Sequence, residues 1–340
     1  MTKRLVDVAE FAGVSVATVR RVLNDRPGIS PATRAAVLTA LDVFGLDRPL
    51  RFRAAKDGLV GLVVPDLQNP IFPAMVEAVL IGLAKLSLMP ALCTRTADGV
   101  SEANYIELLL RREVAGIIFI GASYADAGPQ YGRELRERNI PIVLLNAADE
   151  NDGVVRISVD DAEAADQAMT HLESLGHERI GLVLGPEGHV PSARKLGAFV
   201  QRRRTGPNDQ SWRDLVAHVP FSIEGGSYGA SRLLDQGVTG LVCASDALAL
   251  GAIRAARRRG LSLPGELSVI GFDDSAYMAA VEPPLTTVRQ PVRAMGAAAV
   301  TLLDAQISGH AVPTDELLLA PELIVRGSTG PRVPRADAAR

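Results

Sequence analysis

The sequence predicts a small all-α head followed by an α/β core of two doubly wound parallel sheets. Three observations lead to this prediction. The first 56 residues carry ten lysines and arginines against five acids, whereas the rest of the chain carries 26 against 34. From residue 59 onward, short runs of valine, isoleucine and leucine alternate with helical patterns. With 340 residues, 47% of them hydrophobic, the chain is large enough for two or three domains.

The head is predicted to contain three short helices within residues 5–44, because its apolar residues are spaced to share one core. Ser15 is a favourable N-cap for the second helix, and Ser30 followed by Pro31 is typical of the start of the third. The expected core consists of Leu5, Val8, Ala9, Ala12, Val14, Val19, Val22, Leu23, Val37, Leu38 and Leu41.

Ala9 and Gly13 lie four residues apart, so the first two helices can approach closely, as a helix-turn-helix requires. The surplus of positive charge in the same segment favours a polyanionic partner such as DNA. We therefore predict a helix-turn-helix DNA-binding domain over residues 1–46. Its second helix would present four side chains to the major groove, namely Val16, Ala17, Arg20 and Arg21.

The core shows the alternation of strands and helices that is typical of parallel sheets covered on both faces. The predicted strands are Leu59–Pro65, Pro90–Thr94, Gly116–Gly121, Pro141–Asn146, Val155–Val159, Arg179–Gly185, Ala217–Phe221, Gly240–Ser245 and Ser268–Phe272. The predicted helices between them are Phe72–Leu86, Glu102–Arg112, Ala162–Leu175, Glu224–Leu234 and Ala247–Arg259. Two such halves leave a cleft in which the carboxyl ends of the strands face a ligand.

The last part of the core is too short to fold alone, so its helix Pro291–Ile307 and its strand Glu322–Val325 are expected to complete the two sheets. The tail has no apolar periodicity and is expected to be disordered. The resulting division is a linker at 47–58, a core at 59–329 and a tail at 330–340. Within the core, an N-subdomain would take about 59–158 plus 291–320, and a C-subdomain about 159–290 plus 321–329.

Several classes of protein are disfavoured by what the sequence lacks. No apolar run reaches the roughly 20 residues of a membrane span, and Asp7 interrupts the place of a signal peptide, so we expect a cytoplasmic protein without membrane contact. Cys93 and Cys243 have no CxxC or histidine neighbour, which favours buried free thiols. Without a P-loop or a GxGxxG fingerprint, we predict neither a cofactor nor a metal.

One motif points to an enzyme: Gly225 to Gly229 satisfies G-x-S-x-G, the nucleophile elbow of hydrolases. That elbow needs Ser227 on a sharp turn after a strand, but the preceding strand is expected to end at Phe221. Ser227 would then lie inside the following helix, and the only later histidine is His310. We therefore predict that the chain is not an enzyme.

The head segments LVDVAEFAGVSVATVRRVLNDRPGIS and PATRAAVLTALDVFG resemble the head of the lactose-repressor (LacI/GalR) family. The resemblance continues through the core in VGLVVPDLQNPIFPAM, HLESLGHERIGLVLG, VCASDALALGAIRAARRRGLSLP, LSVIGFDDS and PPLTTVRQPVRAMG, and spans residues 3–329. It implies a periplasmic-binding-protein-like core, a homodimer, and DNA binding that is controlled by a ligand in the cleft. Within the family, ALDVFGLDRPLRFR and PPLTTVRQPVRAMG are most similar to regulators of maltose and α-amylase genes.

The resemblance also implies roles for residues of the head. Those that would read base edges are Val16, Ala17 and Arg21, and those that would hold phosphates are Ser15, Thr18, Asn24, Ser30, Thr33 and Arg34. Arg20 stands where the family usually has serine, and the sequence leaves open whether it contacts DNA or only carries a solvated charge.

The linker departs further from the family pattern. It lacks the asparagine of the hinge helix and is about one helical turn shorter over Pro49 to Gly61. Arg51 and Phe52 still offer a positive charge and an apolar wedge for the minor groove. The sequence leaves open whether they act in this way.

In the core, the resemblance implies a sugar site made of polar groups that bind hydroxyls and rings that cover the sugar. The implied ligand-binding residues are Asn69, Phe72, Asn146, Lys195, Phe221, Ser245, Asp273 and Gln290. Lys195 replaces the usual arginine of the family, which exchanges a planar fork for a point charge. The alternative for each is structural: Asp273 would cap a helix, the phenylalanines would be core, and Asn146 would end a strand.

The sequence thus predicts a ligand-responsive repressor that binds palindromic double-stranded operator DNA as a homodimer and senses a small sugar, with maltose or a related α-glucoside as one candidate. A second possibility is a sugar-binding protein without a role in DNA regulation, such as the solute receptor of a transporter. The basic head and the missing export signal argue against that second possibility.

Overall fold

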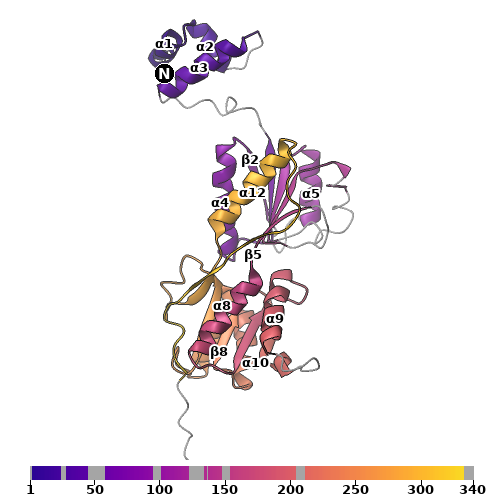
Figure 1. The fold of residues 1–340 in the computed structure, drawn as a ribbon, viewed down its shortest axis with the longest axis vertical. Helices are drawn as coiled ribbons and strands as arrows, with labels where there is room; N and C mark the ends of the chain where they lie inside the picture. Colours follow the sequence, from indigo (N-terminus) through magenta and orange to yellow (C-terminus); the bar gives the residue numbers. More distant parts are fainter. Residues whose placement is uncertain are drawn as a thin grey trace, which may run out of the picture.

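The computed structural model describes residues 2–23, 28–44, 58–94, 101–121, 134–135, 137–147, 154–203 and 211–332. The head contains the three predicted helices: α1 (Thr2–Phe11), α2 (Val16–Leu23) and α3 (Pro31–Val43) (Figure 1). They share one small core around Val8, Val19, Val22, Val37 and Leu41. Each predicted cap is present, because the backbone N–H of Thr18 donates to Ser15 Oγ and that of Thr33 donates to Ser30 Oγ, both at 3.1 Å.

The first sheet of the core has six strands in the order β11-β5-β4-β3-β1-β2, all parallel. The strands are β1 (Leu59–Val64), β2 (Met89–Thr94), β3 (Gly116–Ile120), β4 (Ile142–Leu145), β5 (Val155–Val159) and β11 (Leu317–Leu319). Helices α4 (Ile71–Lys85) and α12 (Val292–Ile307) cover one face, and α5 (Glu102–Arg111) packs on the other. Alternate residues of β3 therefore enter two different cores: Ile118 and Ile120 on one face, Ile117 and Phe119 on the other.

The second sheet has the order β12-β10-β9-β8-β6-β7, and only β12 runs antiparallel to its neighbour. Its strands are β6 (Ile180–Leu184), β7 (Val216–His218), β8 (Gly240–Cys243), β9 (Ser268–Asp273), β10 (Thr286–Arg289) and β12 (Glu322–Ile324). The helices are α8 (Asp161–Ser174) beside α9 (Val190–Arg203) and α10 (Ile223–Asp235) beside α11 (Asp246–Arg258), and the short 3-10 helix η2 (Ser211–Leu215) precedes β7.

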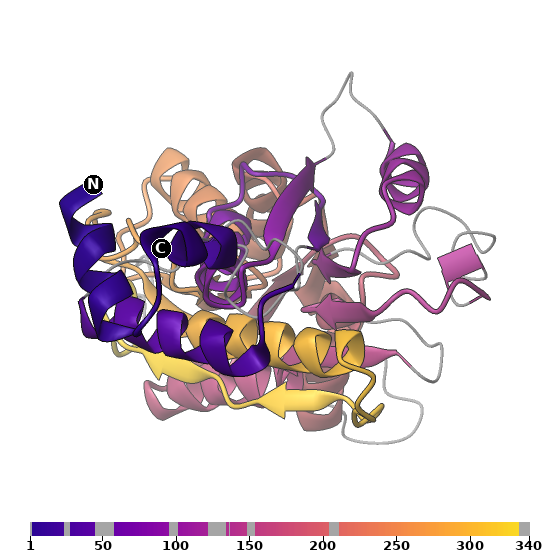
Figure 2. The ribbon, with the colours of Figure 1, turned by 90° about the horizontal axis from the view of Figure 1, so that it is seen from above.

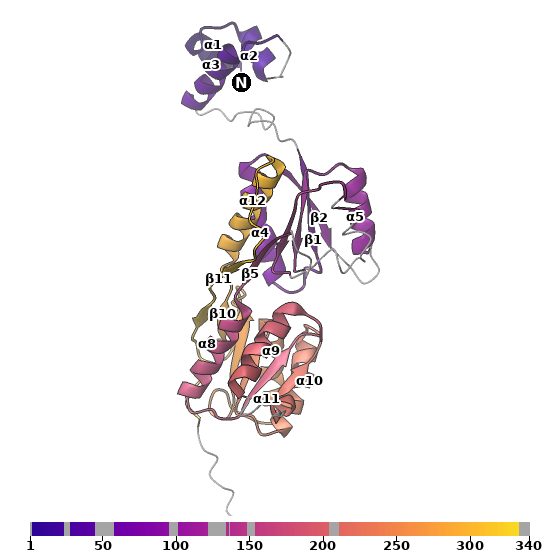
Figure 3. The same cartoon turned by 45° about the vertical axis from the view of Figure 1, so that its right-hand side comes forward.

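The chain passes between the two sheets three times: after β5, after β10, and between β11 and β12. The connecting segments lie together between the halves, beside β5, β10 and β11 (Figure 3). From above, β11 and β12 follow one another along one side of the core (Figure 2). The C-terminal segment thus contributes one strand to each sheet.

Three elements of the core differ from the sequence prediction. Strands β10 and β11 were not among the predicted strands, and β7 ends at His218 instead of Phe221. The strand cannot continue through Pro220, which lacks an N–H, and Ser222 already caps α10 by accepting from the N–H of Gly225. β10 escaped prediction because its first two residues are threonines, although both are fully buried.

The G-x-S-x-G segment lies inside α10, as its sequence context indicated, and Ser227 is buried there. Its glycines serve packing instead of catalysis. A Cβ on Gly226 would overlap the carbonyl oxygen of Leu248, and a Cβ on Gly251 would overlap that of Ile223. The glycines therefore allow α10 and α11 to touch backbone to backbone.

Both cysteines are free and buried, as predicted. Burial raises the pKa of the Cys93 thiol to about 11, so the thiolate form is disfavoured there. No helix within the described ranges combines the length and the apolar character that a membrane crossing requires.

Candidate functional site

The outer face of α2 carries the side chains that were predicted to read base edges. Ala17, Arg20 and Arg21 are exposed there, whereas Val19 and Val22 on the opposite face are fully buried. Val16 is half-buried and packs against the core of the head, so it offers less surface than Ala17. The face that α2 turns to solvent is thus small and cationic at its centre.

The residues that were predicted to hold phosphates cluster at two helix N-termini. Ser15 and Thr18 join their hydroxyls at the start of α2 with 2.9 Å between the oxygens, and Ser30 and Thr33 do so at the start of α3 with 2.8 Å. A helix N-terminus favours an anion through its free N–H groups and its dipole. Arg34 follows in the first turn of α3. Asn24, Arg51 and Phe52 lie outside the described residues.

A cavity of about 560 Å³ lies between the two halves of the core, and all eight predicted ligand residues line it. Four of them stand at the carboxyl ends of strands, where an α/β sheet presents ligands: Asn146 after β4, Ser245 after β8, Asp273 at the end of β9 and Gln290 after β10. Asn69 and Phe72 belong to the first half, whereas Lys195 and Phe221 belong to the second. The cavity also contacts residues that the sequence did not indicate, among them Asp66, Glu102, His189 and Ser192.

Each of the two predicted aromatic faces lies over a glycine that follows a strand. Phe72 lies against Gly121 after β3, and Phe221 lies against Gly185 after β6. A Cβ at either glycine would overlap the ring, so a glycine is required for the ring to lie so close to the strand end. His189 meets Phe221 edge to face, with 4.9 Å between the ring centroids. The two rings therefore bound the cavity from opposite halves.

Asp273 and Gln290 form the polar floor of the cavity. Gln290 Nε2 donates to Asp273 Oδ1 at 2.7 Å, which leaves Asp273 Oδ2 and Gln290 Oε1 buried without a partner. Burial raises the pKa of Asp273 well above its usual range, and the nearby Asp246 carboxylate raises it further. The backbone of Asp273 has a φ of 119°, a strained value for a residue with a side chain. Such strain is typical of functional sites.

Lys195 does not reach into the cavity as a free cation. Its ammonium pairs with the carboxylate of Asp161 and lies 3.7 Å from the centroid of the Phe272 ring. Asp161 is the first residue of α8, directly after the first crossing, and both partners are buried. Burial raises the pKa of Asp161, and the charge of Lys195 opposes that rise. Asp161 was missed at the sequence level because a helix-starting aspartate is ordinarily a capping residue.

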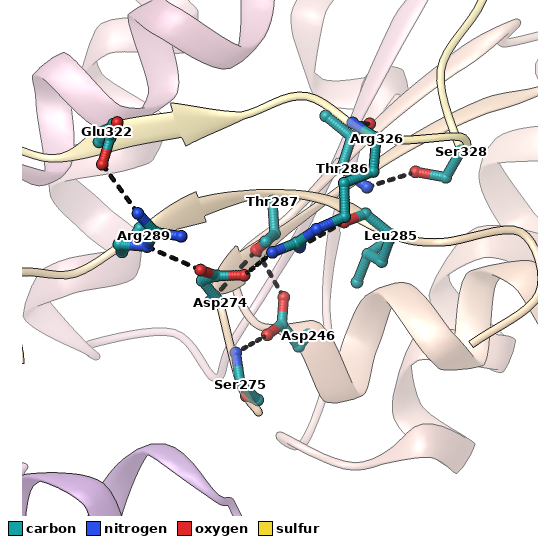
Figure 4. A network of polar contacts seen from close by, with 10 residues as sticks. All are labelled: Asp246, Asp274, Ser275, Leu285, Thr286, Thr287, Arg289, Glu322, Arg326 and Ser328. Atoms are coloured by element: carbon teal, nitrogen blue, oxygen red, sulfur yellow. Dashed lines mark hydrogen bonds and ion pairs between the residues drawn. The ribbon is translucent and has the colours of Figure 1, made fainter. Parts of the chain in front are cut away.

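A second acidic residue, Asp274, follows Asp273 in the sequence and belongs to a network of polar contacts (Figure 4). Asp274 accepts from Arg289 Nε at 2.7 Å and from Arg326 at 2.5 Å, and Arg289 also contacts Glu322 at 3.1 Å. Arg289 directly precedes the second crossing and Glu322 directly follows the third. The residue next to Asp273 is thereby tied to two of the three connections between the halves.

Asp246 forms hydrogen bonds with residues at the carboxyl end of β9 and in β10. It accepts from the hydroxyl of Thr287 at 2.6 Å and from the N–H of Ser275 at 2.7 Å. Burial raises its pKa to about 6. The buried threonine of β10 and the end of β9 are thus held by one carboxylate.

Comparison with known proteins agrees with this geometry. Residues 4–45 match the family described as bacterial regulatory proteins of the lacI family, and residues 169–329 match the periplasmic binding protein-like domain. The chain is 48% identical to the HTH-type transcriptional regulator MalR of Streptomyces coelicolor over 334 residues, which is 97% of each chain. It is 31% identical to the HTH-type transcriptional repressor CytR of Escherichia coli, over 95% of each.

The chain belongs to the LacI family. Among solved structures, a CelR–cellobiose complex is 29% identical with a TM-score of 0.71 and covers 95% of this LacI family chain and 99% of its own. The lac repressor dimer bound to operator and the anti-inducer ONPF is 26% identical, also with a TM-score of 0.71, over 95% and 98%.

The predicted family and fold class are thereby confirmed. Like its LacI family relatives, the protein is a transcriptional regulator and not an enzyme.

Proposed function

We propose that this LacI family regulator is a repressor that binds a palindromic operator as a homodimer and is released by a small sugar in the cleft. One observation carries the proposal: a chain with an arginine-bearing helix-turn-helix also holds a cavity with buried acceptors and two aromatic faces. Acceptors in pairs bind hydroxyls, and rings cover the apolar face of a sugar. The protein would act in the cytoplasm, where the operator lies.

The DNA interface would consist of α2 in the major groove and of phosphates at the N-termini of α2 and α3. Arg21 is the best candidate for reading a base, because a guanidinium binds guanine through two hydrogen bonds. A gel-shift experiment with palindromic fragments from the neighbourhood of the gene tests this interface. Binding should weaken steeply with salt, since phosphate contacts dominate affinity. If no fragment shifts at low salt, the repressor proposal fails.

The homodimer is supported by an exposed apolar surface on the first half. Helix α4 and the edge strand β2 pack side by side. Ile81 on α4 is 52% exposed, and Leu80 is next to it in the sequence. Leu92 on β2 is 47% exposed and points to the same face of the sheet as α4, because it pairs with Leu62 of the core beneath that helix. Patches of this kind mark protein interfaces, and a two-fold dimer would bury the same surface on both subunits. Light scattering should therefore report a dimer for the wild type and a monomer for Ile81→Asp.

The sugar is proposed on the chemistry of the cavity, and a CelR relative of the same fold was solved with cellobiose. Maltose or a related α-glucoside is the first candidate, because of the resemblance of two segments to regulators of maltose and α-amylase genes. A thermal-shift panel of mono- and oligosaccharides tests the proposal, since a ligand that binds only the native state raises its stability. If no sugar raises the melting temperature, sugar sensing is refuted.

Coupling between the two sites would follow from closure of the cleft. A sugar that joins the two halves would rotate one against the other and change the spacing of the paired heads. A typical coupling of about 1–3 kcal/mol corresponds to roughly a 5–150-fold change in DNA affinity. Fluorescence anisotropy of a labelled operator, with and without the sugar, measures this change directly. Equal affinity under both conditions would contradict ligand control.

A further inference from the structure

We propose that the cleft selects sugars without an anionic group and rejects phosphorylated or acidic sugars. The inference rests on the proposed sugar sensing and specifies the class of sugar. It follows from two independent properties of the cavity: the charge of its lining and the kind of hydrogen-bonding atom that is left without a partner.

The charge of the lining is negative. Among the described residues that line the cavity, three are acids, Asp66, Glu102 and Asp273, whereas Lys195 is the one lysine and no arginine takes part. The charge of Lys195 is already matched by the buried Asp161 behind it. Sites for phosphate or carboxylate rely on arginine forks or on free ammonium groups. His189 also lines the cavity, but its Nδ1 accepts from the backbone N–H of Ser192, as only a neutral imidazole can. A phosphate in this cavity would therefore meet carboxylates without a free cation among the described residues of the lining.

The unpartnered buried atoms of the lining are all acceptors. Within the described residues they are Asn146 Oδ1, Asp273 Oδ2 and Gln290 Oε1. The orientation of the Gln290 amide is fixed, because its Nε2 donates to Asp273. Buried acceptors need donors, which the hydroxyls of a sugar supply and which the oxygens of a phosphate dianion lack. The cavity is therefore complementary to hydroxyl groups and opposed to a phosphate.

The electrostatic surroundings of Asp273 support the same selection. Burial and the neighbouring Asp246 carboxylate raise the pKa of this carboxyl, so a further negative charge beside it would be opposed. An incoming dianion would raise the pKa further and require uptake of a proton. A neutral hydroxyl donor instead stabilises the carboxylate through a charge-assisted hydrogen bond.

This selectivity places the signal in a sequence of reactions. The regulator would respond to the sugar before a phosphate is transferred to it. A reaction that hydrolyses a longer glycoside to a neutral sugar would supply the signal, and a phosphoryl transfer to that sugar would remove it.

The experiment is calorimetric titration of the full-length protein with matched pairs: maltose and maltose 6′-phosphate, trehalose and trehalose 6-phosphate, glucose and glucose 6-phosphate. In every pair that binds, the neutral member should bind at least about tenfold more tightly. The reason is that the phosphate would be repelled by the carboxylates of the lining, which carry the same sign of charge. Equal or tighter binding of a phosphorylated member overturns the inference and leaves sugar sensing intact. If no member of any pair binds, sugar sensing by this panel fails and the inference fails with it.

Two isosteric variants test the origin of the selectivity. Asp273→Asn removes a charge and one acceptor, so binding of the neutral sugar should weaken by at least about tenfold. The ratio of affinities between the neutral and the phosphorylated member of a pair should also become smaller. Asp66→Asn removes a charge from the lining and leaves the buried floor unchanged. It should reduce the ratio of affinities within a pair, and should weaken binding of the neutral sugar less than Asp273→Asn does.

The matched control is Asp235→Asn at the end of α10, where the carboxylate pairs with Arg259 and does not line the cavity. It should change neither affinity by more than about twofold. If the control reduces the ratio of affinities within a pair as much as the two cleft variants do, the selectivity reflects the overall charge of the protein and the inference is wrong. Thermal unfolding of each variant shows whether it folds.

Discussion

The buried pair of Lys195 and Asp161 predicts a large and pH-dependent loss of stability when the lysine is removed. In Lys195→Met the carboxylate of Asp161 keeps its position, but one of its oxygens already lacks a partner and the other loses its ammonium. Both side chains are at most 4% exposed, so water cannot replace the lost partner. Breaking a buried pair on one side costs about 3–5 kcal/mol, and we expect a loss of this size at neutral pH.

The pH dependence follows from the direction of the pKa shift. Burial raises the pKa of Asp161 in the folded protein above its unfolded value, and Lys195 partly opposes that rise. Without the lysine the folded pKa rises further, so the folded state binds the proton more tightly than the unfolded state does. Stability of the variant should therefore increase as pH falls from neutral toward the unfolded value near 4.

Urea unfolding at pH 7.5 and pH 5 measures both effects, with the midpoint as the readout. Lys195→Met combined with Asp161→Asn should recover about 1–2 kcal/mol relative to the single variant at pH 7.5, because no buried charge remains. Arg138→Met, which breaks the exposed pair with Glu134, is the control and should change the midpoint little. If the double variant is as unstable as Lys195→Met, the uncompensated carboxylate is not the cause.

Three further predictions concern packing, base readout and coupling. Gly226→Ala should destabilise the protein by about 1–3 kcal/mol, because its Cβ would meet the backbone of α11. Gly197→Ala, which faces open space inside α9, should stabilise it by about 0.5–1 kcal/mol. Urea midpoints compare the two variants, and a change of stability in the same direction for both would contradict the packing account. Arg21→Ala should cost about 1–3 kcal/mol of operator affinity and relax the preference between operators, as measured by competition gel shift; a uniform loss across all sequences would instead indicate phosphate contact. Asp274→Asn should bind sugar almost normally, but sugar binding should change the DNA affinity of the head less than in the wild type, because the contacts with Arg289 and Arg326 are loosened. Unchanged release of labelled operator by the sugar would refute this role.

The parts of the fold that the sequence predicted are those with a local pattern. The caps at Ser15 and Ser30 and the strand runs in the core are encoded within a few neighbouring residues, so their elements were predicted within a few positions. β10 was missed because Thr286 and Thr287 look polar in sequence. Their burial is possible only since Thr287 donates to Asp246 and Thr286 meets Thr329, partners far away in the chain.

The same limit applies to the cleft. The resemblance to a family indicated eight positions, and the structure brings all eight to one cavity. It did not indicate that Asp161 engages the ammonium of Lys195, because that contact joins the start of α8 to the middle of α9. Asp66 and Glu102 also line the cavity without belonging to a recognisable pattern. Partners of this kind depend on tertiary packing, which a single sequence does not display.

The two glycines beneath Phe72 and Phe221 make the width of the cleft a property of positions that have no side chain. An alanine at Gly121 or Gly185 would push the overlying ring toward the cavity, since the ring is the first group its Cβ would meet. Such a change would narrow the space for a ligand by moving a ring, without replacing any polar group of the cavity. Regulators built on this scaffold can therefore acquire a new effector through a glycine such as Gly185, which lies behind the ring and not among the residues that line the cavity.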